Sequence, residues 1–163
     1  MRLLRAALGS ALFFLVAPGV VVGLIPWWLT RWVTEPTPLL PRILGALLLV
    51  VALPLLVGAF VRFVRDGLGT PAPVAPTEHL VVTGAYRYVR NPMYLAVLGA
   101  IVGQALLLGQ PGLLAYAALA AVLVVGFVHL YEQPALRSQF GAEYEAYCRA
   151  VPGWLPRLRP WRA

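Results

Sequence analysis

Long apolar runs, separated by short polar stretches, dominate the chain. Four of these runs approach the length of about 20 residues that a helix needs to cross a bilayer. They cover roughly residues 8–29, 44–64, 94–108 and 113–130. The runs follow one another closely, and no water-soluble core of similar size remains outside them. The pattern predicts an all-α membrane protein, a bundle of about four transmembrane helices forming one domain over residues 1–163.

The composition also indicates a protein that is surrounded by lipid. Of the 163 residues, 61% are hydrophobic and only 12% are charged. Soluble domains carry about 25% charged residues, so a water-soluble fold is a poor interpretation. The chain therefore has the lipid bilayer as its main partner.

Arginine supplies all thirteen basic residues, and its distribution along the chain is uneven. Eleven arginines lie near the N-terminus, in or beside the loop between the second and third runs, or in the tail. Only Arg31 and Arg42 fall on the opposite side of a four-span bundle. Because basic loops stay in the cytoplasm, this split predicts that both termini are cytoplasmic. The net charge of +7 then faces lipid headgroups, and binding of nucleic acid is not indicated.

The first apolar run has the basic start of a secretion signal, with Arg2 and Arg5 before it. However, the run continues past Gly23 to Trp27 and Trp28, which is longer than a typical signal core. We therefore expect an uncleaved first span with an aromatic belt at its outer end.

The inner loop combines a proline-rich strap, residues 67–76, with a short extended stretch, residues 79–82, before a turn at Thr83-Gly84. Asn91-Pro92 is typical of a helix start, because asparagine caps a helix and proline fits its first position. The third helix should therefore present its N-terminus to the cytoplasm. That end of a helix favours an anionic group.

The tail predicts one more helix, which begins at Pro134. Leu136, Phe140, Tyr144 and Tyr147 recur at steps of four, four and three, which places them on one face. We expect a C-terminal interfacial amphipathic helix on the cytoplasmic leaflet, ended by Val151-Pro152. A tail helix folded onto the bundle is the alternative.

Few residues could carry chemistry, and each also has an ordinary structural role. Arg90 could bind a carboxylate or phosphate, or it could simply anchor the helix at the membrane surface. His79 could handle a proton, and Glu132 could bind a ligand or pair with an arginine. Cys148 is expected to be an incidental buried thiol. The sequence shows no metal-ligand cluster, so it predicts a polar pocket facing the cytoplasm without a metal.

Two ordered motifs take the interpretation further. Residues 78–94, EHLVVTGAYRYVRNPMY, resemble a signature of the isoprenylcysteine carboxyl methyltransferase family. Residues 131–136, YEQPAL, with the aromatic residues behind them, resemble the C-terminal signature of that family, and phospholipid methyltransferases share the outline. The resemblance covers about residues 76–156. It implies an integral membrane enzyme that uses S-adenosylmethionine, of the kind found in bacterial inner membranes.

The resemblance also implies which residues form the site. Arg90 and Glu132 are expected to be catalytic. The residues expected to bind the cofactor are His79, Leu80, Val81, Gly84, Tyr86, Arg90, Asn91, Pro92, Tyr94 and Glu132. Gln133 departs from the family, which has a second acidic residue there, and this change removes one negative charge.

A hydrophobic or lipid-anchored acceptor is expected, since most of the remaining surface is apolar. It should enter between the third and fourth helices, where Gly99, Gly103 and Ala105 leave room. Two alternatives stay open. One is a non-enzymatic membrane scaffold. The other is a sterol-reductase-like enzyme, because sterol reductases resemble the tyrosine-rich tail, although they have many more spans.

Overall fold

Helices provide all the regular structure in the part of the chain that the structure, a computed structural model, describes: residues 16–66 and 79–162. The first apolar segment consists of a π-helix, η1 (Gly19–Leu24), followed by α2 (Ile25–Thr30). The long helix α3 (Leu39–Asp66) comes next. Past a 3-10 turn, η2 (Gly84–Arg87), the chain forms α4 (Pro92–Leu108), α5 (Gly112–Phe127), a π-turn η3 (Val128–Glu132) and α6 (Gln133–Ala150).

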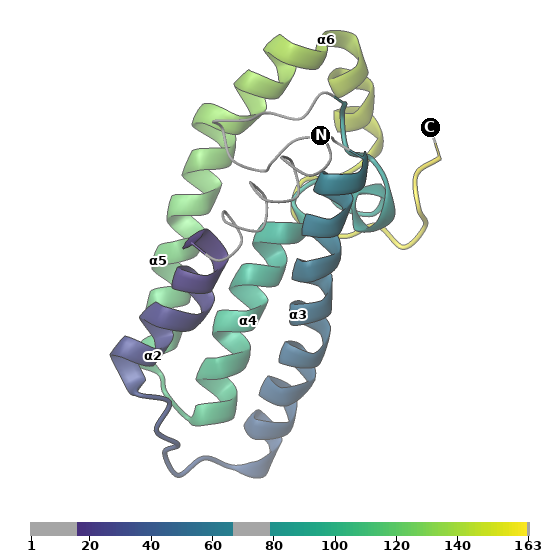
Figure 1. Ribbon diagram of the computed structural model, residues 1–163. Helices are drawn as coiled ribbons and strands as arrows, with labels where there is room; N and C mark the ends of the chain where they lie inside the picture. Colours follow the sequence, from purple (N-terminus) through teal and green to yellow (C-terminus); the bar gives the residue numbers. More distant parts are fainter. Residues whose placement is uncertain (1–15, 67–78, 163) are drawn as a thin grey trace.

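The apolar helices stand side by side, with α4 between α3 and α5 (Figure 1). Two helical stretches, Leu39–Arg62 and Gly112–Ala150, are long and apolar enough to cross a membrane, with mean hydropathies of 2.8 and 2.4. The apolar helices Val16–Thr30 and Pro92–Leu108 are shorter. An all-helical bundle is therefore confirmed for the described residues, whereas four spans remain a prediction.

The closest helix pair is α3 and α4, and glycines make it possible. A Cβ atom added to Gly45 would lie 2.5 Å from the backbone nitrogen of Leu107 and 2.6 Å from the carbonyl oxygen of Gly103. Gly99 likewise faces Ala52 of α3. The expectation that Gly99 and Gly103 leave room for an acceptor between the third and fourth helices was wrong, because both glycines face α3.

The tail helix α6 begins at Gln133 with Pro134 in its first turn, as predicted. It is joined to α5 through η3, so Gly112–Ala150 forms one continuous helical stretch of 39 residues. The π-turn η3 directly precedes α6, where the missing N–H of Pro134 disrupts regular α-helical bonding. The chain bends at Gly141, where φ is 50° and ψ is −122°, a conformation that glycine accepts.

The bend at Gly141 turns the second half of α6 back toward the bundle (Figure 1). Tyr144, Tyr147 and Val151 are buried in one cluster, with Leu136 and Phe140 packed against it. The predicted apolar face therefore exists, but it packs on the protein. The helix ends at Ala150, as Val151-Pro152 predicted.

Arginines separate to the two ends of the bundle. Arg31 and Arg42 lie near the α2–α3 connection, and the other described arginines lie toward the end that carries the inner loop and the tail (Figure 1). The split read from the sequence is thus a real asymmetry of the fold. Which end faces the cytoplasm stays a prediction.

Candidate functional site

The start of α4 positions the centre of the candidate site. Pro92 occupies the first turn, as predicted, and Asn91 is the residue before the helix. The prediction that the Asn91 side chain caps α4 was wrong, because its amide nitrogen donates to the carbonyl oxygen of Gly153 at 3.1 Å. The first amide groups of α4 therefore have no side-chain cap.

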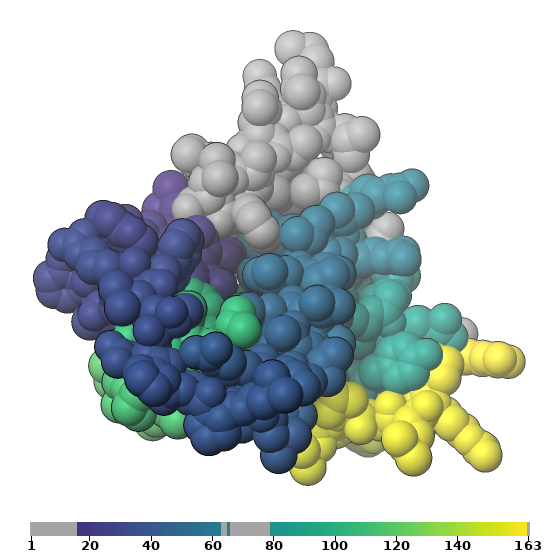
Figure 2. All heavy atoms as spheres, turned by 90° about the horizontal axis from the view of Figure 1, so that it is seen from below, coloured from purple at the N-terminus to yellow at the C-terminus, as the bar shows by residue number. Residues whose placement is uncertain are grey.

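The C-terminal tail runs beside the inner loop and holds it from outside (Figure 2). The amide of Arg90 donates to the carbonyl of Pro152 at 2.9 Å. Farther along, the amides of Arg157 and Trp161 donate to the carbonyls of Tyr88 and Arg87, both at 2.9 Å. We call residues 151–162 the tail strap. Sequence reasoning missed the strap, because irregular backbone pairing leaves no periodic signal.

A small pocket lies where α4 begins, between the inner loop and η3. Its volume is about 20 Å³, which suits a water molecule. Its lining consists of Tyr86, Arg90, Asn91, Pro92, Met93, Tyr94 and Glu132. Six of these seven were predicted from the motifs, and Met93 was missed. Met93 is apolar and stands inside the motif, so its residue type gave no chemical signal.

Arg90 lines this pocket, and its guanidinium has a nitrogen without a hydrogen-bond partner. One terminal nitrogen donates to the sulfur of Cys148 at 3.0 Å, and the hydroxyl of Tyr144 lies beside the same group. The Nε atom is buried and has no hydrogen-bond partner. Leaving a buried charged donor unpaired is costly, which suggests that a ligand completes its coordination. The half-buried Cys148 packs on the tyrosine cluster of α6, as expected of an incidental thiol, and it also contacts Arg90.

Glu132 lies on the wall opposite the inner loop, at the end of η3. Its carboxylate is hydrogen-bonded to the hydroxyl of Tyr94. The second oxygen, Oε2, is buried and has no partner. The pocket thus combines a cationic group and an anionic group, each with one buried polar atom unpaired.

Tyr86 closes the pocket from the inner loop and is only 6% exposed. Burial raises the pKa of the Tyr86 hydroxyl well above its ordinary value, and the nearby negative charge of Glu132 raises it further. The hydroxyl is therefore neutral at physiological pH. The Tyr86 carbonyl accepts a hydrogen bond of 2.7 Å from the buried hydroxyl of Tyr147, which fixes η2 on α6.

Four residues that the motifs assign to the cofactor do not line this pocket. His79 is exposed. Leu80 packs on the tyrosine cluster of α6, and Val81 is buried in the core of the bundle. Gly84 has a φ of 56°, and a Cβ atom there would lie 3.0 Å from Nε of Arg62. A direct role for these four residues stays a prediction.

Comparison with known families identifies the chain. A family model for phospholipid methyltransferases matches residues 40–143, nearly two thirds of the sequence. The chain belongs to this family. Searches of curated proteins and of solved structures found no match.

Membership confirms the resemblance seen in residues 78–94 and 131–136, both of which lie inside the matched range. This phospholipid methyltransferase family member is therefore a membrane protein, with methyl transfer to lipid-like substrates as the activity of its family. The matched range also contains Arg90, Glu132 and the whole of α4.

Proposed function

We propose that the chain binds S-adenosylmethionine at the pocket between Arg90 and Glu132 and transfers its methyl group to a hydrophobic or lipid-anchored acceptor. The reaction takes place at the cytoplasmic face of the membrane. The observation that carries the proposal is that Arg90 and Glu132, each with one buried polar atom that lacks a hydrogen-bond partner, line the same pocket.

The charged and polar groups of the pocket suit the amino-acid end of the cofactor, which carries a carboxylate and an ammonium group. A carboxylate is attracted by a guanidinium and by the uncapped amide groups of a helix N-terminus. Arg90 and the start of α4 supply both. The carboxylate of Glu132 suits an ammonium group or a ribose hydroxyl. The two charges therefore match a ligand that carries both signs.

The space is smaller than the ligand. A volume of about 20 Å³ is far below the roughly 300–1,000 Å³ typical of small-molecule sites. Binding therefore requires the pocket to widen. The contact between Arg90 and Cys148 is one that a ligand carboxylate would replace with a stronger, charge-assisted bond.

Methyl transfer requires alignment and exclusion of water more than strong acid–base groups. The bound cofactor supplies an activated methyl group on a sulfonium. The chain holds the two charged ends, closes the site with the neutral Tyr86 and keeps water out with the tail strap. Gln133, which follows Glu132, is neutral, so Glu132 supplies the only carboxylate among the described residues that line this pocket.

Calorimetry with S-adenosylhomocysteine tests the proposal. Arg90→Ala and Glu132→Ala should each weaken binding by about 2 kcal/mol or more, the scale for losing one partner of a desolvated charged contact. Arg149→Ala and Glu143→Ala are the matched controls, because both side chains are exposed and neither lines the pocket. The controls should bind as the unmodified protein does.

Two outcomes would replace this function with another. Unmodified protein that does not bind the cofactor would favour the membrane scaffold, and binding of a nicotinamide cofactor instead would favour the reductase. Equal loss of affinity in the controls and in the pocket variants would move the site elsewhere.

A further inference from the structure

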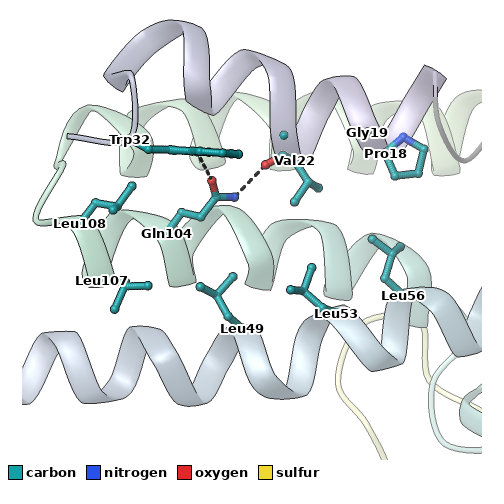
Figure 3. Close-up of a pocket in the computed structure, with 11 residues that line it drawn as sticks. Pro18, Gly19, Val22, Trp32, Leu49, Leu53, Leu56, Gln104, Leu107 and Leu108 are labelled. Carbon is teal, nitrogen blue, oxygen red and sulfur yellow. Dashed lines mark hydrogen bonds between the residues drawn. The ribbon is translucent and has the colours of Figure 1, made fainter. Parts of the chain in front are cut away.

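Buried polar atoms without a hydrogen-bond partner concentrate at the end of the bundle that carries the Arg90 pocket. Gln104, buried in α4 farther from that end, has its partners: its amide nitrogen donates to the carbonyl of Val22 at 2.8 Å, and its oxygen accepts from the Trp32 indole nitrogen at 3.1 Å (Figure 3). Among the described residues the atoms without a partner are Nε of Arg90, Oε2 of Glu132, Nε1 of Trp154 and, near the opposite end, Nε of Arg42. Three of these four atoms therefore belong to the Arg90 pocket or to the tail strap.

The Pro152-Gly153 segment of the tail strap lies directly against Arg90 and Asn91. The amide of Arg90 donates to the carbonyl of Pro152 at 2.9 Å, and the side-chain amide of Asn91 donates to the carbonyl of Gly153 at 3.1 Å. A Cβ atom added to Gly153 would lie 3.2 Å from Nη2 of Arg90 and 3.8 Å from its Cζ atom. The guanidinium therefore packs on the bare backbone of Gly153.

The Arg90 guanidinium is thus held on two sides. Nη1 donates to the sulfur of Cys148 at 3.0 Å, and Nη2 packs on Gly153, while the buried Nε has no partner. A ligand carboxylate that takes the place of the Cys148 contact leaves Gly153 as the surface that supports the guanidinium. An arginine side chain loses much conformational entropy when a ligand orders it, so a contact that fixes it beforehand favours binding.

We propose that Gly153 is a positioning residue for cofactor binding: its lack of a side chain lets the Arg90 guanidinium lie on the tail strap, and Asn91 fixes the strap in that place. The proposal rests on the proposed function, which assigns Arg90 to the cofactor carboxylate. Gly153 lies outside residues 40–143, the range that the family model matches. Asn91, which the motif assigns to the cofactor, then acts on the site through Gly153.

The backbone of Gly153 does not itself require glycine. Its φ is not positive, so residues with side chains can adopt the same conformation. The three atoms nearest to an added Cβ atom are all side-chain atoms of Arg90 or Asn91. Because a guanidinium ends a long, flexible side chain, it can move aside by a few tenths of an ångström at little cost in stability. Alanine at this position should therefore displace Arg90 and leave the strap folded.

Calorimetry with S-adenosylhomocysteine on the purified full chain tests the proposal through a double-mutant cycle. Gly153→Ala should weaken binding about fivefold, since a misplacement of about 1 Å in a site can cost roughly a hundredfold and the shift here is smaller. Arg90→Lys keeps the positive charge and removes Nη2, so Gly153→Ala should cost no further affinity in that background. Gly126→Ala on α5 is the matched control: its Cβ atom meets nothing within 4 Å, and it should bind as the unmodified protein does.

A spectroscopic readout follows the guanidinium itself. In micelles of the protein prepared with isotopically labelled arginine, the resonance of the buried Arg90 Nε–H group is identified by its loss in Arg90→Lys. Gly153→Ala should shift this resonance in the absence of cofactor, and Gly126→Ala should leave it in place. A glycine needed only for the fold of the strap would lower the melting temperature and leave the coupling to Arg90 absent.

The outcomes separate a failure of Gly153 from a failure of the proposed function. Unmodified protein that does not bind S-adenosylhomocysteine would overturn the proposed function and the role of Gly153 with it. Binding that Arg90→Lys weakens and Gly153→Ala leaves unchanged would overturn the role of Gly153 alone. Equal losses from Gly153→Ala with and without Arg90→Lys would also overturn it, because the strap would then act on the pocket without Arg90.

Discussion

Replacing Gly45 of α3 by alanine tests whether α3 packs closely against α4 at this position. A Cβ atom at Gly45 would lie 2.5 Å from the Leu107 nitrogen and 2.6 Å from the Gly103 carbonyl oxygen. Real Cβ atoms essentially never approach so closely, and both neighbours belong to the backbone of α4. Neither atom can turn away as a side chain would, so Gly45→Ala must push α3 and α4 apart.

The magnitude follows from two opposing effects. Overpacking typically costs about 1–3 kcal/mol, and replacing a helical glycine by alanine gains roughly 1 kcal/mol. Since the clash at Gly45 involves two backbone atoms, we place its cost at the upper end and expect a net loss of about 2 kcal/mol. Gly58→Ala meets nothing within 4 Å, so only the favourable effect of alanine, up to about 1 kcal/mol, should remain.

Alanine substitutions at two further glycines should give smaller losses of stability than Gly45→Ala. Gly103→Ala would bring its Cβ atom to 2.9 Å from the side chain of Leu49 and 3.1 Å from the carbonyl of Gly45, so the loss should be intermediate. Gly99→Ala would make an ordinary contact of 3.5 Å with Ala52 and should be close to neutral. Reversible unfolding in mixed detergent micelles gives the free energies. Gly45→Ala as stable as Gly58→Ala would refute the proposed α3–α4 contact.

The remaining predictions concern the end of the bundle that carries the site. Tyr147→Phe removes the 2.7 Å hydrogen bond to the buried Tyr86 carbonyl, and it should lower the free energy of unfolding by about 1–3 kcal/mol. Tyr131→Phe, an exposed tyrosine, is the control for that change and should be nearly neutral in the same unfolding measurement. Gln133→Glu would introduce a charge at a position only 9% exposed, so it should cost several kcal/mol of stability. A Gln133→Glu variant that keeps its melting temperature and binds S-adenosylhomocysteine more tightly would show that the missing acid only weakens cofactor attraction.

The sequence predicted the positions of the helices correctly where nearby residues determine them. Proline is favoured in the first turn of a helix, and α4 begins at Pro92. The apolar runs located α3 and α5, because burial in lipid requires continuous apolar helices. Arg90 and Glu132 were expected at one pocket from the two motifs, and the fold brings both to its lining.

Other features depend on partners that are distant in the sequence. Asn91 can cap α4 or reach another segment, and its partner Gly153 lies 62 residues away. Composition shows that Gly99 and Gly103 permit close packing, but it does not say which neighbouring helix they face. The bend at Gly141 was also missed, since glycine inside a helical pattern usually costs only some stability.

The central claim is that one cofactor occupies the pocket between Arg90 and Glu132. A density map of the purified protein with S-adenosylhomocysteine added tests it most directly. The account predicts ligand density at the N-terminus of α4, with its carboxylate on Arg90 and its ammonium or a ribose hydroxyl on Glu132. Ligand density elsewhere in the bundle, with Nε of Arg90 and Oε2 of Glu132 still unpaired, would contradict it.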